Sequence, residues 1–332
     1  TVRVPVSVVD KSGQPVMGLR GEDFAISEDG RKQVVTYFSS ERRPLRIALA
    51  LDISASMETK IREVEAALRH FIDLLEPNDE ILVITFSDRV EVVQDFTSDR
   101  ERLGRVLNLL QPFGATALFD ATKEAIRRVA PGPAESKAVV LVTDGMDTIS
   151  ATSWAELREL ARRSEVPVFS IGLGNDFTFS GLTGSLPGGG GRVRGPGRGP
   201  RGWPGGWPGG GGGAWPGGIG GGGIGGGGGG GNGWPRGPVQ SGRGRADFDG
   251  RVLTDLAEET GARAEILQGL DRDRGDVDRL KDSVESIAMT LRHRYLVGYD
   301  PATGQKGWRK IKVDVARPSV DAHARKGYYS EG

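Results

Sequence analysis

Four stretches of the chain, residues 45–51, 81–86, 138–143 and 166–172, are almost continuously apolar. A strand with one face in water alternates apolar and polar residues, so unbroken runs of this length indicate strands buried on both faces of a parallel sheet. Such a sheet is stable only when helices cover both faces. The four runs therefore restrict this part of the chain to an α/β fold.

Amphipathic segments lie between and after these strands, as an α/β fold requires. Apolar side chains recur at helical spacing in residues 61–75. We expect further helices over 102–110, 118–129, 153–163, 252–260 and 277–291, and further strands over 90–96 and 264–267. Ser153 and Glu156 are spaced as a capping box. The alternation predicts a doubly wound, mostly parallel sheet in residues 45–292.

Both ends of the chain have β character. Strand patterns occur over 2–9, 24–28 and 33–38, with turn signals at 10–13 and 28–31, and again over 295–299, 308–315 and 327–329. A few strands cannot bury an apolar face alone. We predict that residues 1–44 and 293–332 form the two halves of one small β-sandwich. Two separate β appendages are the alternative.

Residues 181–246 interrupt the α/β pattern with a low-complexity tract. The tract holds 34 of the 53 glycines, seven arginines and no acidic residue, and Trp-Pro pairs recur in it at irregular spacing. With so few apolar side chains it cannot offset the entropy of ordering glycine, so we expect a disordered insertion. The alternative is a segment that binds nucleic acid or glycans, because Arg and Trp can stack on bases and sugars.

Composition argues against several classes of protein. The formal net charge is zero, and without the tract's seven arginines 37 basic residues face 44 acidic ones, which does not suggest a nucleic-acid-binding core. The absence of cysteine excludes disulfides and thiolate metal sites. No apolar run reaches the roughly 18 residues of a membrane-spanning helix.

The polar residues after the first buried strand are the main candidates for a functional site. Asp52, Ser54 and Ser56 alternate along the sequence directly after residues 45–51. One loop can therefore direct a carboxylate and two hydroxyls to one point at the carboxyl edge of the sheet, where open α/β sheets bind ligands. Such hard oxygen donors suit Mg²⁺, with Mn²⁺ or Ca²⁺ as alternatives.

Two further oxygen donors are expected at the same edge. Asp144 follows the buried strand 138–143, and Thr116 lies in a loop that runs into the helix of residues 118–129. Each piece alone is a weak signal, because Asp followed by small residues is often only a turn or a helix cap. Their conjunction with Asp52, Ser54 and Ser56 predicts a cation site.

These five residues resemble the metal-ion-dependent adhesion site (MIDAS) of von Willebrand factor A (VWA) domains, and the resemblance covers residues 45–292 without the tract. In that family the matching hydroxyls contact the cation directly and the carboxylates often act through water. This chain has Ala55 where the family most often has glycine. The resemblance implies a non-catalytic module whose cation accepts an Asp or Glu carboxylate from a partner protein.

The β ends are similar to those of a bacterial group of exported VWA-related proteins. The similarity rests on residues 8–16, Leu19, Asp23 and Phe24, and on residues 295–299 and 325–329. It implies a periplasmic, cell-surface or secreted protein, and we expect its signal peptide upstream of Thr1, because the chain starts within a predicted strand. An intracellular scaffold whose cation site supports assembly of a complex is the alternative.

An enzyme is the rival to a binding module. A nucleophilic Ser54 would need a base beside it, and the only histidines are His70, His293 and His323, none of them close to the motif in sequence. The metalloprotease, nucleophile-elbow and phosphate-loop motifs are also absent. We therefore predict no catalytic activity.

Overall fold

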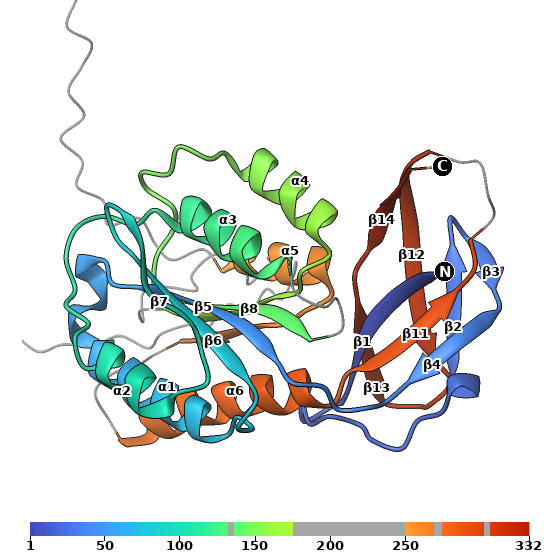
Figure 1. Cartoon of the computed structure of the whole chain (residues 1–332), viewed down its shortest axis with the longest axis horizontal. Coiled ribbons are helices and arrows are strands. Elements are labelled where there is room, and N and C mark those ends of the chain that lie inside the picture. Colours follow the sequence, from blue (N-terminus) through green and yellow to red (C-terminus); the bar gives the residue numbers. More distant parts are fainter. Residues whose placement is uncertain (132–135, 175–249, 269–273, 302–305, 332) are drawn as a thin grey trace, which may run out of the picture. The chain divides into compact units, whose positions relative to one another are not determined.

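The computed structural model describes residues 1–131, 136–174, 250–268, 274–301 and 306–331. It contains a six-stranded sheet in the order β10-β9-β8-β5-β6-β7 (Figure 1). Its strands are β5 (Arg46–Asp52), β6 (Glu80–Phe86), β7 (Val90–Thr97), β8 (Lys137–Thr143), β9 (Val168–Leu173) and β10 (Ala264–Leu267). Neighbouring strands pair in parallel except for β7, which runs antiparallel to β6 at one edge.

Helices cover both faces of this sheet (Figure 1). One face carries α1 (Ile61–Asp73), α2 (Arg100–Leu107) and α6 (Arg274–Arg292), and the other carries α3 (Leu118–Val129), α4 (Trp154–Ser164) and α5 (Arg251–Thr260). Successive residues of β5 alternate between the layers: Ile47 and Leu49 pack with the first group, Ala48 and Ala50 with the second. All four are fully buried, and the predicted α/β fold with a mostly parallel sheet is confirmed.

Local sequence signals set the starts of two helices. The Oγ of Ser153 accepts a hydrogen bond from the N–H of Glu156, whose carboxylate accepts the N–H of Ser153 at 2.8 Å, so the predicted capping box forms at α4. Asp99 caps α2 with its side chain, and that helix begins at Arg100 rather than at residue 102. The Asp99 cap therefore places Arg100 and Glu101 in α2, two residues that the apolar pattern alone did not assign to this helix.

The structure also contains two four-stranded antiparallel sheets, in the orders β13-β1-β11-β4 and β14-β12-β2-β3. Their strands are β1 (Val2–Asp10), β2 (Phe24–Glu28), β3 (Arg31–Gln33), β4 (Val35–Ser39), β11 (Tyr295–Tyr299), β12 (Gly307–Val315), β13 (Val320–Ala324) and β14 (Gly327–Ser330). Two short 3-10 helices, η1 (Gly21–Asp23) and η2 (Ala55–Thr59), complete the described elements. Each sheet combines strands from both ends of the chain.

The two antiparallel sheets share one apolar core and so form a β-sandwich. Val4, Val6 and Val8 of β1 pack there with residues of β2, β11 and β12. In β1 every second side chain faces this core, and Ser7 and Val9 on the other face are buried as well. The division of the chain into domains at residues 44 and 292 stays a prediction. The tract of residues 181–246 lies outside the described residues.

Two details of the β strands differ from the sequence-based expectation. The single strand predicted over 33–38 is two strands, β3 and β4, which belong to different sheets and are separated by the exposed Val34. The sequence pattern did not predict β13, because Asp and Ala have low β propensity. This strand forms through its pairing with β1, which runs from Val6 opposite Ala324 to Asp10 opposite Val320.

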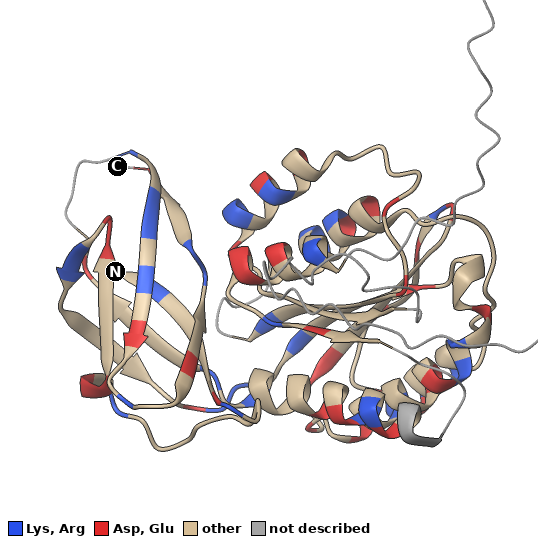
Figure 2. Ribbon diagram, turned by 180° about the vertical axis from the view of Figure 1, so that it is seen from behind, with Lys and Arg blue, Asp and Glu red and all other residues tan. Residues whose placement is uncertain are grey.

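The outer sides of the helices carry charged residues. Figure 2 shows Lys and Arg interspersed with Asp and Glu along them. Within the described ranges, no helix combines the length and the apolar character needed to cross a bilayer.

Candidate metal centre

The carboxyl ends of β5 and β8 lie side by side, because these two strands pair in parallel. Asp52 is the last residue of β5, and Asp144 directly follows β8. The turn of η2 carries Ser54 and Ser56 over the same edge, with Ser54 at its N-cap. The order of the central strands therefore brings together two predicted pieces of the site that lie about ninety residues apart in the sequence.

Asp52 is 1% exposed, and both its carboxylate oxygens accept hydrogen bonds. Oδ1 accepts the N–H of Ser54 at 2.8 Å, and Oδ2 accepts the hydroxyl of Thr143 at 2.5 Å. Burial raises the pKa of Asp52 to about 6, although the hydrogen bonds from Ser54 and Thr143 act in the opposite direction. Its carboxylate is thus held in a fixed orientation within the protein, with Thr143 as a partner that the sequence reading had missed.

A chain of short oxygen–oxygen contacts leads from the first loop to the second. The Ser54 and Ser56 hydroxyls are 3.0 Å apart, and Ser56 Oγ donates to Asp144 Oδ1 at 2.7 Å. Ser54 and Asp144 are buried, whereas Ser56 is exposed, so the chain of donors reaches the surface at Ser56. Three of the predicted ligands therefore form one connected cluster with access to solvent.

Thr116 is placed beside this cluster by backbone contacts between three loops. The N–H of Ala55 donates to the carbonyl of Gly114 at 3.1 Å, which ties the Thr116 loop to η2. The Thr116 N–H donates to Thr148 Oγ1 at 2.9 Å, and the Thr148 N–H donates back to the Thr116 carbonyl at 2.9 Å. A Cβ added to Gly145 would lie 3.5 Å from Thr116 Oγ1. The Thr116 hydroxyl therefore lies against the residue that follows Asp144.

Asp88, in the loop after β6, holds the Thr116 loop from its other side. Its Oδ1 accepts the N–H of Ala115 at 2.5 Å. Gly114 has a φ of 75°, and a Cβ there would lie 2.6 Å from the Asp88 carboxyl group. Only glycine fits this position without strain. No spacing in the sequence could identify Asp88, because its role depends on a contact with a loop some 27 residues away.

Lys60 is a second residue at the site that the sequence reading missed. Its side chain is 5% exposed, and its Nζ donates to Asp144 Oδ2 at 2.7 Å. Asp147, which follows the Asp144 loop, is half-buried and accepts the N–H of Phe119 at 3.0 Å. Asp147 thus caps the start of α3, whose own N-cap residue, Ala117, has no side-chain acceptor.

The cluster has the donor types and the spacing that a small divalent cation requires. Oxygens in cis positions around Mg²⁺, at about 2.0–2.1 Å from the ion, lie about 2.9 Å from each other. The hydrogen-bond distances of 3.0 Å and 2.7 Å along Ser54, Ser56 and Asp144 are close to that edge length. Among the described residues, no group of three His, Cys, Asp or Glu side chains is placed to hold a metal ion. The proposed site does not depend on such a group, because most of its donors are hydroxyls. These donor types fit a small divalent cation, and Mg²⁺ as its identity stays a prediction.

The histidines contact other parts of the chain. His70 Nε2 lies 3.5 Å from Glu285, His293 Nε2 lies 3.0 Å from Arg42, and His323 is on β13. No described hydrogen bond joins a histidine to Ser54 or Ser56, the two motif serines. The absence of catalysis stays a prediction.

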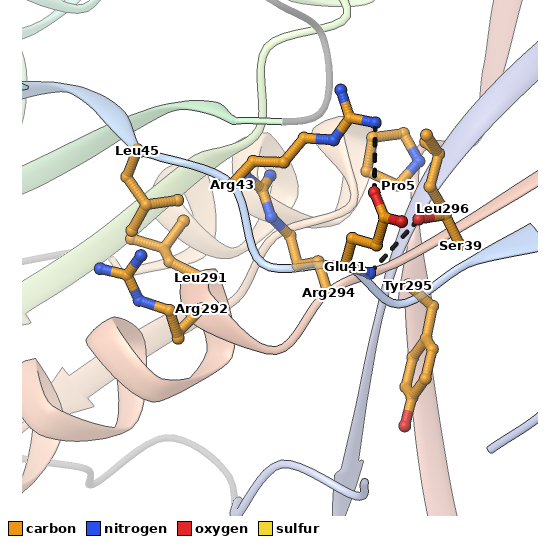
Figure 3. A pocket seen from close by; sticks show the side chains of 10 residues that line it. All are labelled: Pro5, Ser39, Glu41, Arg43, Leu45, Leu291, Arg292, Arg294, Tyr295 and Leu296. Carbon is orange, nitrogen blue, oxygen red and sulfur yellow. Dashed lines mark hydrogen bonds and ion pairs between the residues drawn. The ribbon is translucent and has the colours of Figure 1, made fainter. Parts of the chain in front are cut away.

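A small pocket lies where the segments before β5 and after α6 pass each other (Figure 3). Its volume of about 20 Å³ has room for about one water molecule. Arg43 and Glu41 form an ion pair at 3.9 Å on its rim, and burial lowers the pKa of Arg294 in its wall to about 10. None of the residues that line the pocket belongs to the candidate cation site.

Residues 47–146 match the model of the von Willebrand factor type A domain family. The chain contains a VWA domain. The matched range begins in β5 and ends just after β8, so it includes all five residues predicted to bind the cation. That these residues form a MIDAS stays a prediction.

Curated relatives share only part of their length with this chain. An uncharacterized protein of Synechocystis sp. is 32% identical over 108 residues, which are 31% of this chain and 26% of that protein. An uncharacterized protein of Borreliella burgdorferi is 26% identical over 144 residues, which are 40% of this chain and 42% of that protein. The chain thus spans less than half the length of either relative.

Several solved VWA-type structures resemble the chain at low identity. A von Willebrand factor type A protein from Catenulispora acidiphila is 14% identical, with a TM-score of 0.48 over 93% of this chain and 63% of that one. The conserved hypothetical protein BatB from Bacteroides thetaiotaomicron is 14% identical, with a TM-score of 0.44 over 74% and 98%. The vWF domain of the pilus tip protein Mfa5 from Porphyromonas gingivalis is 21% identical, with a TM-score of 0.31 over 35% and 44%.

Proposed function

We propose that this chain is a divalent-cation-dependent protein-binding module. Asp52, Ser54, Ser56, Thr116 and Asp144 hold the cation, Mg²⁺ in the first place, and an Asp or Glu of a partner protein binds to it. When bound, the cation supplies a positive centre with an exchangeable position for that carboxylate. The observation that carries the proposal is the connected set of oxygens from Ser54 to Asp144 that opens to solvent at Ser56.

The chemistry of the donors favours binding of an external anion. Three of the five proposed ligands are neutral hydroxyls, and both oxygens of Asp52 are already engaged by the N–H of Ser54 and the hydroxyl of Thr143. The three hydroxyls add no negative charge to the site, so the cation can still attract a further carboxylate. The chain's own residues hold and orient the site and leave one side of it open.

Apolar side chains beside the site suggest what surrounds the partner's carboxylate. Phe113 precedes the Thr116 loop, Ile149 follows the Asp144 loop, and each is 47% exposed. Backbone hydrogen bonds fix both near the site: the N–H of Phe113 donates to the carbonyl of Ile53, and the N–H of Ile149 to that of Thr116. We infer an acidic residue flanked by apolar ones on the partner, presented outside the cytoplasm in keeping with the export expected from the β ends.

A thermal melt of the whole chain in EDTA and in excess Mg²⁺, Mn²⁺ or Ca²⁺ tests the cation site. A cation at about 100 times its dissociation constant adds about 2.7 kcal/mol to the free energy of unfolding, or roughly 5–10 °C in Tm. Asp52→Ala should abolish the shift, while Asp255→Ala, an exposed carboxylate on α5, should keep it. A wild-type protein that gains nothing from any cation contradicts the proposal.

Acetate then tests whether the bound cation accepts a carboxylate. Sodium acetate should raise the Tm of the Mg²⁺-loaded protein further than sodium chloride at equal ionic strength, and it should have no such effect in EDTA. If the two salts raise the Tm equally in Mg²⁺, the bound cation offers no exchangeable position to a carboxylate. That result contradicts the proposed binding of a partner.

A further inference from the structure

Lys60 is a buried lysine that no part of the proposed cation site requires as a ligand. It lies between η2 and α1, and its Nζ contacts both Asp144 Oδ2 at 2.7 Å and the carbonyl of Leu173 at 3.4 Å. Removing an ammonium group from water is costly unless a partner compensates for the lost hydration. Asp144, whose side chain is 0% exposed, supplies that compensation.

The backbone holds Lys60 in this place. Its N–H donates to the carbonyl of Met57 at 2.9 Å, and its own carbonyl accepts the N–H of Val64 at 3.0 Å. The residue therefore ends η2 and caps α1 at the same time. These two bonds fix the Cα of Lys60 between the two elements, and from there its side chain, 5% exposed, reaches Asp144.

Lys60 and Ser56 share the two oxygens of one carboxylate. Oδ2 of Asp144 faces the Lys60 ammonium group, and Oδ1 accepts the hydroxyl of Ser56. A carboxylate held from both sides has one orientation, and only Oδ1 is directed at the cluster. Lys60 thus positions the oxygen that the cation would meet.

The charges of the site add a second consequence. Asp52 and Asp144 together carry two negative charges when ionised, which a divalent cation alone would cancel. Lys60 adds one positive charge, so these three side chains and a divalent cation together carry a net charge of about +1, which favours one further carboxylate from outside. The same ammonium group repels the divalent cation.

We propose that Lys60 is a built-in counter-cation of the metal site. It stabilises the fold when no cation is bound, it weakens the binding of divalent cations, and it leaves the loaded site with the positive charge that holds the partner's carboxylate. This inference rests on the proposed function and adds to it the residue that balances cation affinity against ligand affinity.

The test compares wild type with Lys60→Met, which keeps the length of the side chain and removes its charge. Calorimetric titration of the whole chain with Mg²⁺ should show at least about tenfold tighter binding in Lys60→Met, because a repelling charge is gone. Its Tm in EDTA should fall, and the extra stabilisation by acetate in Mg²⁺ should shrink. Lys123→Met is the matched control, since the Lys123 Nζ donates only to the Thr152 hydroxyl among its described hydrogen bonds.

Opposite changes in Mg²⁺ affinity and acetate response separate a charge effect from distortion of the site, which would weaken both. Equal or weaker Mg²⁺ binding by Lys60→Met overturns the inference while the proposed function stands. A wild type that binds no cation overturns both.

If Lys60→Met is too unstable to titrate, a double-mutant cycle with Asp144→Asn in EDTA takes its place. Strong coupling supports the counter-cation role, and additive effects overturn it.

Discussion

Ser56 Oγ donates a 2.7 Å hydrogen bond to Asp144 Oδ1, although 88 residues separate the two in the chain. The contact exists because β5 and β8 are adjacent parallel strands whose carboxyl ends meet at one edge of the sheet. It joins the exposed end of the hydroxyl cluster to a carboxylate that Lys60 holds from the other side. The proposed cation site thus depends on the strand order as much as on its ligands.

Ser56→Ala should lower the affinity for Mg²⁺ by at least about 10-fold, because even the loss of residues that only support a ligand costs 10–100-fold in metal sites. The stability in EDTA should change little, since Ser56 is exposed. Isothermal titration calorimetry with Mg²⁺ checks the affinity, with Ser98→Ala, an exposed serine before α2, as the control. An unchanged affinity would remove Ser56 from the ligand set.

Gly114→Ala should destabilise the Thr116 loop, because a Cβ at φ 75° would lie 2.6 Å from the carboxyl group of Asp88. Gly30→Ala is the matched control, since Gly30 has a φ of 81° but no atom within 4 Å of the added Cβ. Both variants carry a backbone cost of about 1–3 kcal/mol for the left-handed conformation. Only Gly114→Ala should cost more than this and also weaken Mg²⁺ binding. Urea unfolding and calorimetry measure the two effects, and equal losses in both variants would argue against the Asp88 contact.

Glu28→Gln should destabilise the β-sandwich without affecting cation binding. The Glu28 carboxylate is 1% exposed and accepts hydrogen bonds from Tyr299 at 2.5 Å, Tyr328 at 3.1 Å and Arg309. Loss of its charge leaves the largely buried Arg309 with the partly exposed Asp29 as its acidic partner among the described residues, at a cost of about 3–5 kcal/mol for breaking a buried pair. The Tm should fall by several degrees, and the increment that Mg²⁺ adds should stay the same.

The exposed Glu22 provides the control for this variant. It contacts Arg20 at 3.7 Å on the surface, where an ion pair contributes at most about 1 kcal/mol. Glu22→Gln should therefore leave the Tm nearly unchanged. Equal effects of the two substitutions would show that the Glu28 cluster contributes no more than a surface pair.

The contribution of His323, on β13, to the stability of the fold should fall on mild acidification. Burial, followed by the nearby Arg263, lowers the pKa of His323, while Asp321 and Glu258 act in the opposite direction. A histidine with a lowered folded-state pKa contributes its stability above its ordinary pKa of about 6.5 and loses it as the pH falls through the folded-state value. His323→Gln should therefore lose less Tm than wild type between pH 7.5 and pH 5.5. His70→Gln, on α1, is the control. If the Tm of His323→Gln falls with pH as steeply as the Tm of wild type, the assignment of this effect to His323 is contradicted.

Much of the fold could be predicted from the sequence, because its signals are local. The unbroken apolar runs identified β5, β6, β8 and β9 to within two residues, since a strand buried on both faces tolerates little else. The capping box of Ser153 and Glu156 located the start of α4, because it needs only residues three apart. By contrast, β13 forms through its pairing with β1. The break at Val34 arises because β3 and β4 join different sheets. No local sequence pattern indicates either feature.

For the candidate site, the amino-acid sequence was enough to propose five oxygen donors, because Asp52, Ser54 and Ser56 lie at fixed spacing after a recognisable strand, and Thr116 and Asp144 adjoin recognisable elements. Their role as ligands stays a prediction. How those donors are held became clear from the folded chain alone. Thr143 on Asp52, Asp88 on the Thr116 loop and Lys60 on Asp144 are contacts between segments 27 to 91 residues apart. These contacts form where parallel strands and their loops meet. From the sequence alone, Thr143, Asp88 and Lys60 cannot be distinguished from solvent-exposed polar residues.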